Sequence, residues 1–249
     1  MGDVVRFTGA VLAGGASRRM GRDKAAIEVG GVTMLARATA ALYDAGAESV
    51  LVIGGAGVDV RVGLDGDGDG DGEVGVGLDR TVHVDDGWPG EGPLGGLITA
   101  LDATDSSIVV VIACDLVWLD AESIRAVVTS LFGDPVETDT NAPRSPGTGR
   151  EPVTADVVND VLAAVAFTDR REPLCAAWRR HDALAVLLSA FVDGERSIAR
   201  VLDRMPVIEV CVRPWALTNV NTPEELAEAA REAAGADTGA TPVEQGLTT

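Results

Sequence analysis

The chain is poor in the residues that build disulfide frameworks, zinc sites and aromatic-rich surfaces. It has three cysteines, Cys114, Cys175 and Cys211, and two histidines among 249 residues. The cysteines are widely separated and form no CxxC pair, so neither a disulfide framework nor a zinc site is indicated. Aromatic residues make up 4% of the chain, against 46% hydrophobic residues. The core should therefore consist mostly of Val, Leu, Ile and Ala, which suits a parallel sheet covered by helices.

Positive charge is also scarce. Twenty Lys and Arg residues stand against 39 Asp and Glu residues, which gives a net charge of −19. Nucleic-acid binding needs a basic face, so we expect no nucleic-acid partner, although a local basic loop is enough for a nucleotide. The apolar run 107–114 is too short to span a membrane. No basic region precedes the apolar stretch 8–16, as a signal peptide would require. We expect a cytoplasmic protein without a membrane partner.

Strand-like and helix-like segments alternate along the chain. The hydrophobic pattern predicts strands at 7–13, 49–53, 81–84, 108–112 and 207–212, and helices at 33–45, 94–103, 121–132, 181–191, 196–202 and after Thr222. Two further apolar segments, 161–167 and 174–178, flank a polar turn at 168–172. This alternation predicts a three-layer α/β fold with a mostly parallel central sheet.

We expect a single domain over residues 1–234 and a disordered tail over 235–249. Within the domain, a Gly/Asp-rich acidic insertion covers about 63–77 and a loop covers about 133–152. The repeat from Asp65 to Gly72 imitates a calcium-binding loop. The twelfth position is Val76 or Leu78, however, where an EF-hand needs a bidentate Glu. A flexible acidic surface insertion is the better interpretation.

The most informative segment reads AVLAGGASRRMGRDK, from Ala10 to Lys24. A strand runs into two glycines, which let the backbone approach a phosphate, and the basic residues that follow supply cations. The spacing matches neither the Walker A motif nor the dinucleotide fingerprint. An ordinary strand–helix turn with exposed basic residues is the alternative. The concentration of positive charge in so acidic a chain favours a triphosphate cradle.

Three further groups of polar residues are candidates for the same site. Asp115 follows the strand 108–112 and could be a Mg²⁺ ligand or a helix cap. Asp86 follows the strand 81–84 and could hold a metal, bind a substrate hydroxyl or simply be solvated. Asn219 and Asn221 precede the last helix and suit a cation, a ribose or a turn. Ligands bind beyond the carboxyl ends of parallel strands, so residues 13–15, Asp86 and Asp115 should lie on one edge.

In this order, the segments resemble the molybdenum cofactor guanylyltransferase family. The resemblance covers roughly residues 7–230. Its first block is Leu12-Ala13-Gly14-Gly15 with Ser17, Arg19-Met20-Gly21 and Asp23-Lys24. The later blocks are 30–35, 86–97, Cys114-Asp115, 172–175 and 219–226.

The resemblance implies a three-layer, Rossmann-like nucleotidyltransferase fold. It also implies Mg²⁺-dependent transfer of GMP from GTP to the phosphate of molybdopterin, or of its molybdenum form, with release of pyrophosphate. Transient contact with the apoproteins of molybdenum enzymes would follow. The alternatives are a cytidylyltransferase for the same cofactor, a guanylyltransferase for another phosphorylated metabolite, or a non-catalytic nucleotide-binding homologue.

The same resemblance implies roles for single residues. The backbone of Leu12, Ala13, Gly14 and Gly15 would hold the guanine and the triphosphate. Arg19 and Lys24 would neutralise the phosphates and, with Asp115, make up the catalytic residues. Asp86 would contact the nucleotide, and Asp115 would hold Mg²⁺ together with Asn221 or Asn219.

Overall fold

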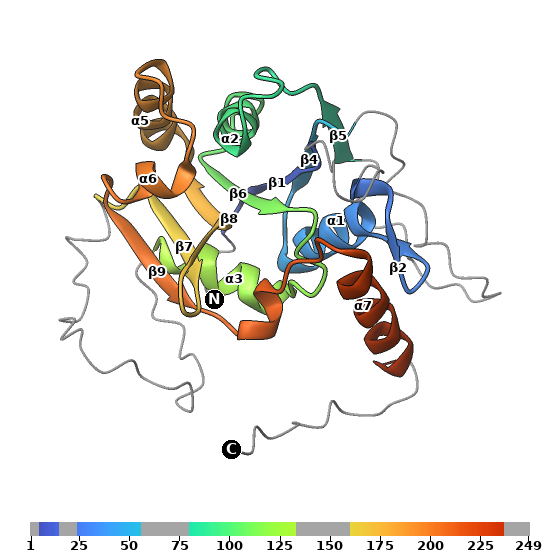
Figure 1. Cartoon of the computed structure of the whole chain (residues 1–249). Helices are drawn as coiled ribbons and strands as arrows, with labels where there is room; N and C mark the ends of the chain where they lie inside the picture. The colour runs from blue at the N-terminus through green and yellow to red at the C-terminus, as the bar shows by residue number, and fades with distance from the viewer. Residues whose placement is uncertain (1–4, 15–23, 56–79, 133–159, 237–249) are drawn as a thin grey trace.

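The computed structural model describes residues 5–14, 24–55, 80–132 and 160–236 (Figure 1). Their centre is a seven-stranded sheet with the order β5-β4-β1-β6-β8-β7-β9. In that order the strands are Thr81–Val84, Ser49–Ile53, Thr8–Leu12, Ile108–Ala113, Arg171–Arg179, Ala163–Phe167 and Val207–Cys211. The five predicted strands are therefore confirmed to within one residue at each end, and the two further apolar segments are strands β7 and β8.

The sheet is mostly parallel, as predicted. β5, β4, β1 and β6 pair in parallel, and so do β7 and β9. Strand β8 is antiparallel to both of its neighbours, β6 and β7. It begins at Arg171, inside the stretch that the sequence assigns to a turn, because Arg171 and Glu172 pair with Phe167 and Ala166 beyond an irregularity that leaves residues 173–175 of β8 without partners in β7. The polar turn between the two strands is correspondingly shorter.

Helices cover both faces of the sheet, which confirms the three-layer α/β fold (Figure 1). Helices α1 (Met34–Ala45) and α3 (Ala121–Ser130) pack on one face. Helices α2 (Pro93–Asp102), α5 (Arg180–Val192) and α6 (Ile198–Leu202) pack on the other. Strand β1 supplies both cores, because Val11 faces the first set of helices and Ala10 and Leu12 face the second.

Local signals explain where helix α1 begins and ends. Its N-cap is Thr33, whose hydroxyl accepts a hydrogen bond from Ala36 N at 3.1 Å. It ends at Gly46, where φ is +104° and a side chain would be strained. Gly9 in β1 lets this helix approach the sheet, since a Cβ there would lie 2.8 Å from a methyl group of the buried Leu42.

A smaller third cluster joins segments from both ends of the described chain. It includes the short hairpin of β2 (Glu28–Val29) and β3 (Val32–Thr33), the loop after β6, and α7 (Pro223–Ala236). Its buried members are Ile27, Val29, Met34, Val117, Val220 and Ala229. The 3₁₀ helices η1 (Lys24–Ala26) and η3 (Pro214–Leu217) flank these segments in the chain. Packing in this cluster places the neighbouring residues Lys24 and Asn221 close to Asp115.

Helix α7 begins after Thr222, as predicted, and continues to Ala236, two residues into the stretch that the sequence assigns to the tail. The acidic insertion at 63–77, the loop at 133–152 and the rest of the tail lie outside the described residues. Within the described ranges, no helix has the length and apolar character needed to cross a membrane.

Candidate functional site

The turns that follow the four parallel strands β5, β4, β1 and β6 lie side by side at one edge of the sheet. Backbone hydrogen bonds continue the ladder beyond the strands: from Gly54 N to Val84 O (2.9 Å), from Ala13 N and Gly14 N to Ile53 O (3.0 and 3.1 Å), and from Cys114 N to Leu12 O (3.4 Å). Each turn therefore has its neighbour as a rigid support. The residues that follow these turns, including Asp86 and Asp115, are held along the same rim.

Glycines make this close approach possible. Gly54 and Gly55 have φ values of +72° and +64°, which favour glycine. A Cβ on Gly54 would lie 3.0 Å from the Cα of Gly14, and one on Gly55 would lie 2.8 Å from the Cβ of Ala13. The turn after β4 therefore packs directly against the turn that begins the predicted phosphate cradle.

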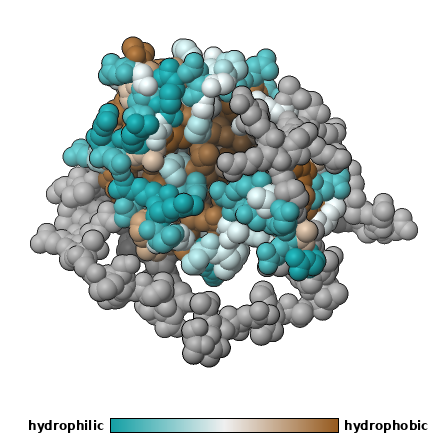
Figure 2. All heavy atoms as spheres, viewed as in Figure 1, coloured by the Kyte–Doolittle hydropathy of each residue, from teal (hydrophilic) through white to brown (hydrophobic). Residues whose placement is uncertain are grey.

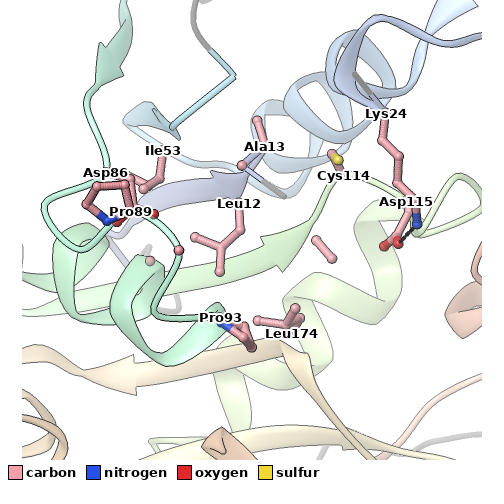
Figure 3. Close-up of a pocket in the computed structure, with 15 residues that line it drawn as sticks. Leu12, Ala13, Lys24, Ile53, Asp86, Pro89, Pro93, Cys114, Asp115 and Leu174 are labelled. Carbon is pink, nitrogen blue, oxygen red and sulfur yellow. Dashed lines mark hydrogen bonds and ion pairs between the residues drawn. The ribbon is translucent and has the colours of Figure 1, made fainter. Parts of the chain in front are cut away.

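A cleft of about 690 Å³ opens above this rim (Figure 3). Most of its lining is apolar or glycine, and three charged residues, Lys24, Asp86 and Asp115, project into it. The remaining lining residues are Leu12, Ala13, Gly14, Ile53, Pro89, Gly90, Gly92, Pro93, Gly96, Ala113, Cys114 and Leu174. In the space-filling view, apolar residues form the floor of a hollow bordered by hydrophilic ones (Figure 2).

The charged groups are divided between two ends of the cleft. Lys24 and Asp115 lie together at one end, and Asp86 lies with Pro89 at the other (Figure 3). Leu12 and Ala13 lie between them. An elongated ligand with one highly charged part and one less charged part would match this division.

At the Lys24 end, two oxygen atoms converge on one ammonium group. Lys24 Nζ donates to Asp115 Oδ2 at 2.8 Å and to Asn221 Oδ1 at 2.5 Å. The side chains of Lys24 and Asp115 are 20% and 17% exposed, so water screens this ion pair less than a surface pair. Asn219 does not join the contact, and its Oδ1 is buried without a hydrogen-bond partner.

Asn221 is placed by the cap of helix α7. Glu225 Oε2 accepts from Asn221 N at 2.6 Å and from Thr222 N at 3.1 Å, while Thr222 Oγ1 accepts from Glu225 N at 3.2 Å. This is a capping box, in which side chains at both ends of the first turn satisfy free backbone donors. Val220 N also donates to Asp115 O at 3.1 Å. The segment before α7 is thereby hydrogen-bonded to the loop after β6.

A hard divalent cation fits the same pair of oxygen atoms. A carboxylate and an amide oxygen are suitable ligands, and here they already converge on one positive charge. Within the described ranges, no group of three or more His, Cys, Asp or Glu residues could form a metal site from protein ligands alone. A cation at Asp115 and Asn221 would therefore need further oxygens from water or from a phosphorylated ligand.

At the other end, Asp86 shapes the loop that follows β5. Its Oδ1 accepts from Trp88 N at 2.9 Å, two residues ahead. Gly87 N donates to Thr99 Oγ1 at 3.1 Å, and that hydroxyl donates to Gly95 O at 3.0 Å within α2. Asp86 thus has a structural role in the turn as well as a place in the cleft wall.

Glu172 lies beside the cleft without being one of its lining residues. Burial raises the pKa of its carboxyl, and the charge of Asp115 acts in the same direction. Two influences oppose the shift: the hydrogen bond from Leu174 N, at 3.3 Å, and the positive charge of Arg170. Leu174 lines the cleft, so strand β8 brings a second carboxylate close to Asp115.

The structure brings most of the predicted site residues together. Six of them line the cleft, namely Leu12, Ala13, Gly14, Lys24, Asp86 and Asp115, and Asn221 joins them through Lys24. Gly15 and Arg19 lie outside the described residues.

Several lining residues were absent from the predicted set of site residues. Ile53 was identifiable as the end of a predicted strand, Ala113 and Cys114 as the residues just after one, and Pro89 to Pro93 as a Gly/Pro loop. Leu174 could not be found in this way, because β8 runs antiparallel to β6. The first half of β8, and not its carboxyl end, therefore lies at the edge where the parallel strands end.

The comparisons with known proteins agree with this fold. The pattern of the MobA-like NTP transferase domain matches residues 9–209. A probable molybdenum cofactor guanylyltransferase of Opitutus terrae is 31% identical over 230 residues, covering 88% of this chain and 92% of the relative.

Two solved structures illustrate the structural likeness. The molybdopterin-guanine dinucleotide biosynthesis protein A of Archaeoglobus fulgidus has a TM-score of 0.61 at 19% identity, covering 92% of this chain and 99% of that one. A Mycobacterium tuberculosis protein, solved in complex with manganese, has a TM-score of 0.59 at 18% identity, covering 91% and 99%.

The raised pKa of Glu172 predicts a pH-dependent cost to stability. Because the folded protein holds this proton more tightly than the unfolded chain, its free energy of unfolding should fall as the pH rises from 4.5, the usual pKa, through the raised pKa. Glu172→Gln keeps an oxygen for Leu174 N and removes the titration. We expect this variant to be more stable than the wild type at neutral pH and to match it below pH 4.5. Urea denaturation across this pH range measures the difference.

Glu28→Gln, at an exposed position of β2, is the matched control and should leave the pH profile unchanged. Parallel stability profiles of Glu172→Gln and the wild type would contradict the prediction.

Proposed function

Because this chain belongs to the MobA-like NTP transferase family and is a nucleotidyltransferase, we propose that it transfers GMP from GTP to the phosphate of molybdopterin or its molybdenum form. Pyrophosphate would be the second product. The names of the relatives support molybdenum cofactor guanylyltransferase activity. The choice of GTP, of the acceptor and of the metal is our proposal.

One observation carries the proposal: Lys24 and Asp115 meet at the end of a cleft that is also lined by Ala13 and Gly14, in the turn after β1. A lysine suits a triphosphate, and a carboxylate beside it suits the cation that accompanies it. Three elements far apart in the sequence converge here, since Asp115 is 91 residues from Lys24 and Asn221 is 197 residues from it.

The two ends of the cleft suggest how the nucleotide lies. Its phosphates would lie at the Lys24 end, and its nucleoside would extend past Leu12 and Ala13 toward Asp86 and Pro89. In that orientation the turn after β1 contacts the nucleotide along its length. Gly15 and Arg19, which continue this turn in the sequence, would add a backbone contact and a second cation.

The chemistry needs positioning and charge neutralisation more than proton transfer. An oxygen of the acceptor phosphate attacks the α-phosphorus of GTP, and a P–O bond forms. The bond between the α-phosphorus and the oxygen that bridges to the β-phosphorus breaks, and pyrophosphate leaves with that electron pair. The attacking phosphate is already ionised, so no strong general base is required. Lys24 would neutralise the negative charge of the phosphates.

We propose that Asp115 and Asn221 hold a divalent cation, Mg²⁺ in the cell. When bound, such a cation neutralises triphosphate charge and orients the phosphates. The convergence of both oxygens on Lys24 Nζ supports the assignment. The structural neighbour solved with manganese is also consistent with it. Lys24 would have to turn from these oxygens toward the phosphates when the metal and the nucleotide bind.

The substrate assignment can be tested directly by pyrophosphate release. Purified protein is incubated with Mg²⁺, molybdopterin and either GTP or CTP, with inorganic pyrophosphate as the readout. We expect release that depends on both GTP and the acceptor. A preference for CTP would make the chain a cytidylyltransferase. If pyrophosphate is released from GTP only with another phosphorylated acceptor, that compound would replace molybdopterin as the proposed acceptor. Tight GTP binding without turnover would favour a non-catalytic homologue.

The metal assignment predicts two losses in Asp115→Asn. Turnover should be abolished, and Mn²⁺ binding, measured by electron paramagnetic resonance, should weaken sharply, because the neutral amide is a much poorer ligand than the carboxylate. Circular dichroism should show an intact fold. Asp102→Asn, at an exposed position in the last turn of α2, is the control and should change neither readout. Wild-type turnover or Mn²⁺ affinity in Asp115→Asn would remove Asp115 from the metal site.

Lys24→Ala should separate phosphate stabilisation from metal binding. We expect a rate loss of roughly 10²–10³, the cost of deleting one group that stabilises transition-state charge. Mn²⁺ binding should persist, because Asp115 and Asn221 both remain. Single-turnover kinetics and Mn²⁺ titration measure the two effects. An unchanged rate would show that Lys24 does not act on the reacting phosphates.

A further inference from the structure

The loop from Asp86 to Pro93 forms one wall of the cleft and is supported from its outer side. Pro89, Gly90, Gly92 and Pro93 line the cleft. The loop has little regular structure, with one turn closed by Glu91 N donating to Trp88 O at 3.1 Å. Gly90 and Gly92 have φ values of +85° and +83°, a region open mainly to glycine. So permissive a backbone needs outside contacts to keep one conformation.

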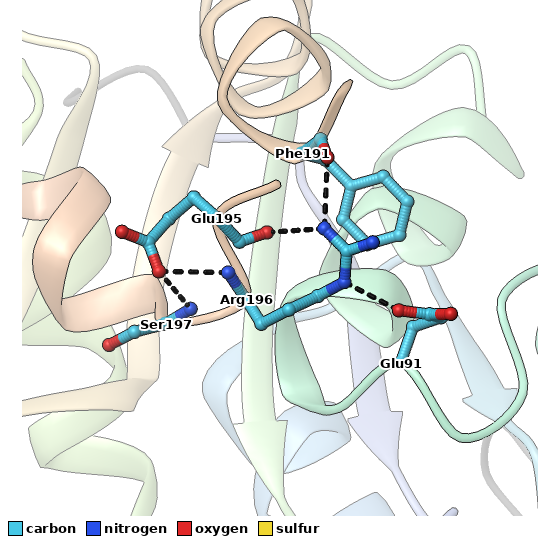
Figure 4. Close-up of polar contacts among 5 residues, drawn as sticks. All are labelled: Glu91, Phe191, Glu195, Arg196 and Ser197. Carbon is cyan, nitrogen blue, oxygen red and sulfur yellow. Dashed lines mark hydrogen bonds and ion pairs between the residues drawn. The ribbon is translucent and has the colours of Figure 1, made fainter. Parts of the chain in front are cut away.

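Those contacts come from the turn between helices α5 and α6. Arg196 Nε donates to Glu91 Oε2 at 2.5 Å, across 105 residues of sequence (Figure 4). The guanidinium carbon of Arg196 also lies 4.0 Å from the centre of the Phe191 ring. Phe191 in turn packs against Trp88, with ring centres 4.9 Å apart and planes inclined at 59°. The loop is therefore held at both Trp88 and Glu91.

Arg196 is itself held rigidly. Its Nη1 donates to Phe191 O at 2.9 Å and to Glu195 O at 2.8 Å. Its backbone N and that of Ser197 donate to Glu195 Oε1 at 2.8 and 2.9 Å (Figure 4). The planar guanidinium thus uses several donors and a ring face at once, which a lysine could not reproduce.

Trp88 is equally constrained on its other side. A Cβ on Gly95 in helix α2 would lie 2.7 Å from the Cβ of Trp88, so the tryptophan packs directly on the helix backbone. The loop is consequently confined between α2, Phe191 and Arg196. The Arg196 and Glu91 side chains are 41% and 47% exposed, so their ion pair adds little to global stability. Its main effect should be on the loop.

We propose that Arg196 is a positioning residue for nucleotide binding, acting through Glu91 and through the Phe191–Trp88 contact to hold the cleft wall in its binding conformation. This inference rests on the proposed function, in which the nucleoside lies at the Asp86–Pro89 end. A wall held in place before binding avoids the entropic cost of ordering it. Arg196 makes no contact with the reacting phosphates in this arrangement, so binding should depend on it more than the chemical step does.

The test uses full-length Arg196→Gln, Arg196→Lys and Glu91→Gln. GTP affinity is measured by calorimetry, KM and kcat by pyrophosphate release, and the order of residues 87–92 by amide hydrogen exchange without nucleotide. In Arg196→Gln we expect Kd and KM for GTP to rise on the order of tenfold, as they would if the binding conformation fell to about a tenth of the population. The value of kcat should change by less than about twofold.

The other variants separate positioning from general disruption. Arg196→Lys should recover only part of the affinity, because it keeps the charge but not the planar contact with Phe191. Combining Glu91→Gln with Arg196→Gln should cost less than the sum of the single changes, since both act on one contact. Arg200→Gln is the matched control: it removes an ion pair with Glu195 in the same turn, at 3.3 Å, without touching the loop. It should leave GTP affinity and loop exchange unchanged.

Wild-type GTP affinity in Arg196→Gln would overturn the inference, as would an equal loss in Arg200→Gln. The proposed function fails separately, if the wild-type protein binds neither GTP nor CTP. In that case faster amide exchange at 87–92 in Arg196→Gln, but not in Arg200→Gln, would still support the positioning role on the loop. Unchanged exchange would reject it.

Discussion

The register of four parallel strands at one edge of the sheet is the constraint on which the rest of the site depends. The backbone bonds from Gly54 to Val84, from Gly14 to Ile53 and from Cys114 to Leu12 continue the ladder into the turns. Each turn is supported by its neighbour, and this support fixes the positions of Asp86, Gly14 and Asp115. Loops carry the candidate site residues, and the buried sheet fixes the positions of these loops.

A second constraint is electrostatic. In a chain with a net charge of −19, Lys24 joins a carboxylate after β6 and an amide before α7. These segments are packed together by a hydrophobic cluster that includes Ile27, Met34, Val117 and Val220. The two members of the ion pair are therefore held close to one another. A polar contact at the edge of a cleft thereby couples the beginning, middle and end of the described chain.

The opposite end of the cleft has a different construction. Its wall is a Gly/Pro loop whose shape depends on Asp86 from within and on Phe191 and Arg196 from outside. The charged end is thus held by ion pairing and helix capping, while the other end is held by aromatic packing and one arginine. Such a division suits a ligand that combines a polyphosphate with a planar base.

Local patterns in the sequence were enough to predict the parallel strands, the start of the last helix after Thr222, and the placement of Gly14, Asp86 and Asp115 at one edge. These features depend on residues close together in the chain and on general rules of parallel sheets. Asn221 was predicted as a site residue, but its contact with Lys24 was not, because that contact joins residues 197 positions apart in the chain.

Three features depend on the packing of the folded chain: the antiparallel direction of β8, the place of Leu174 in the cleft wall and the support of Glu91 by Arg196. Each depends on contacts between segments far apart in the sequence, and no local pattern encodes the distance between such segments. Which segments form strands, helices and a glycine turn follows from the sequence, because those are properties of neighbouring residues. The packing of the sheet and helices determined which side chains meet.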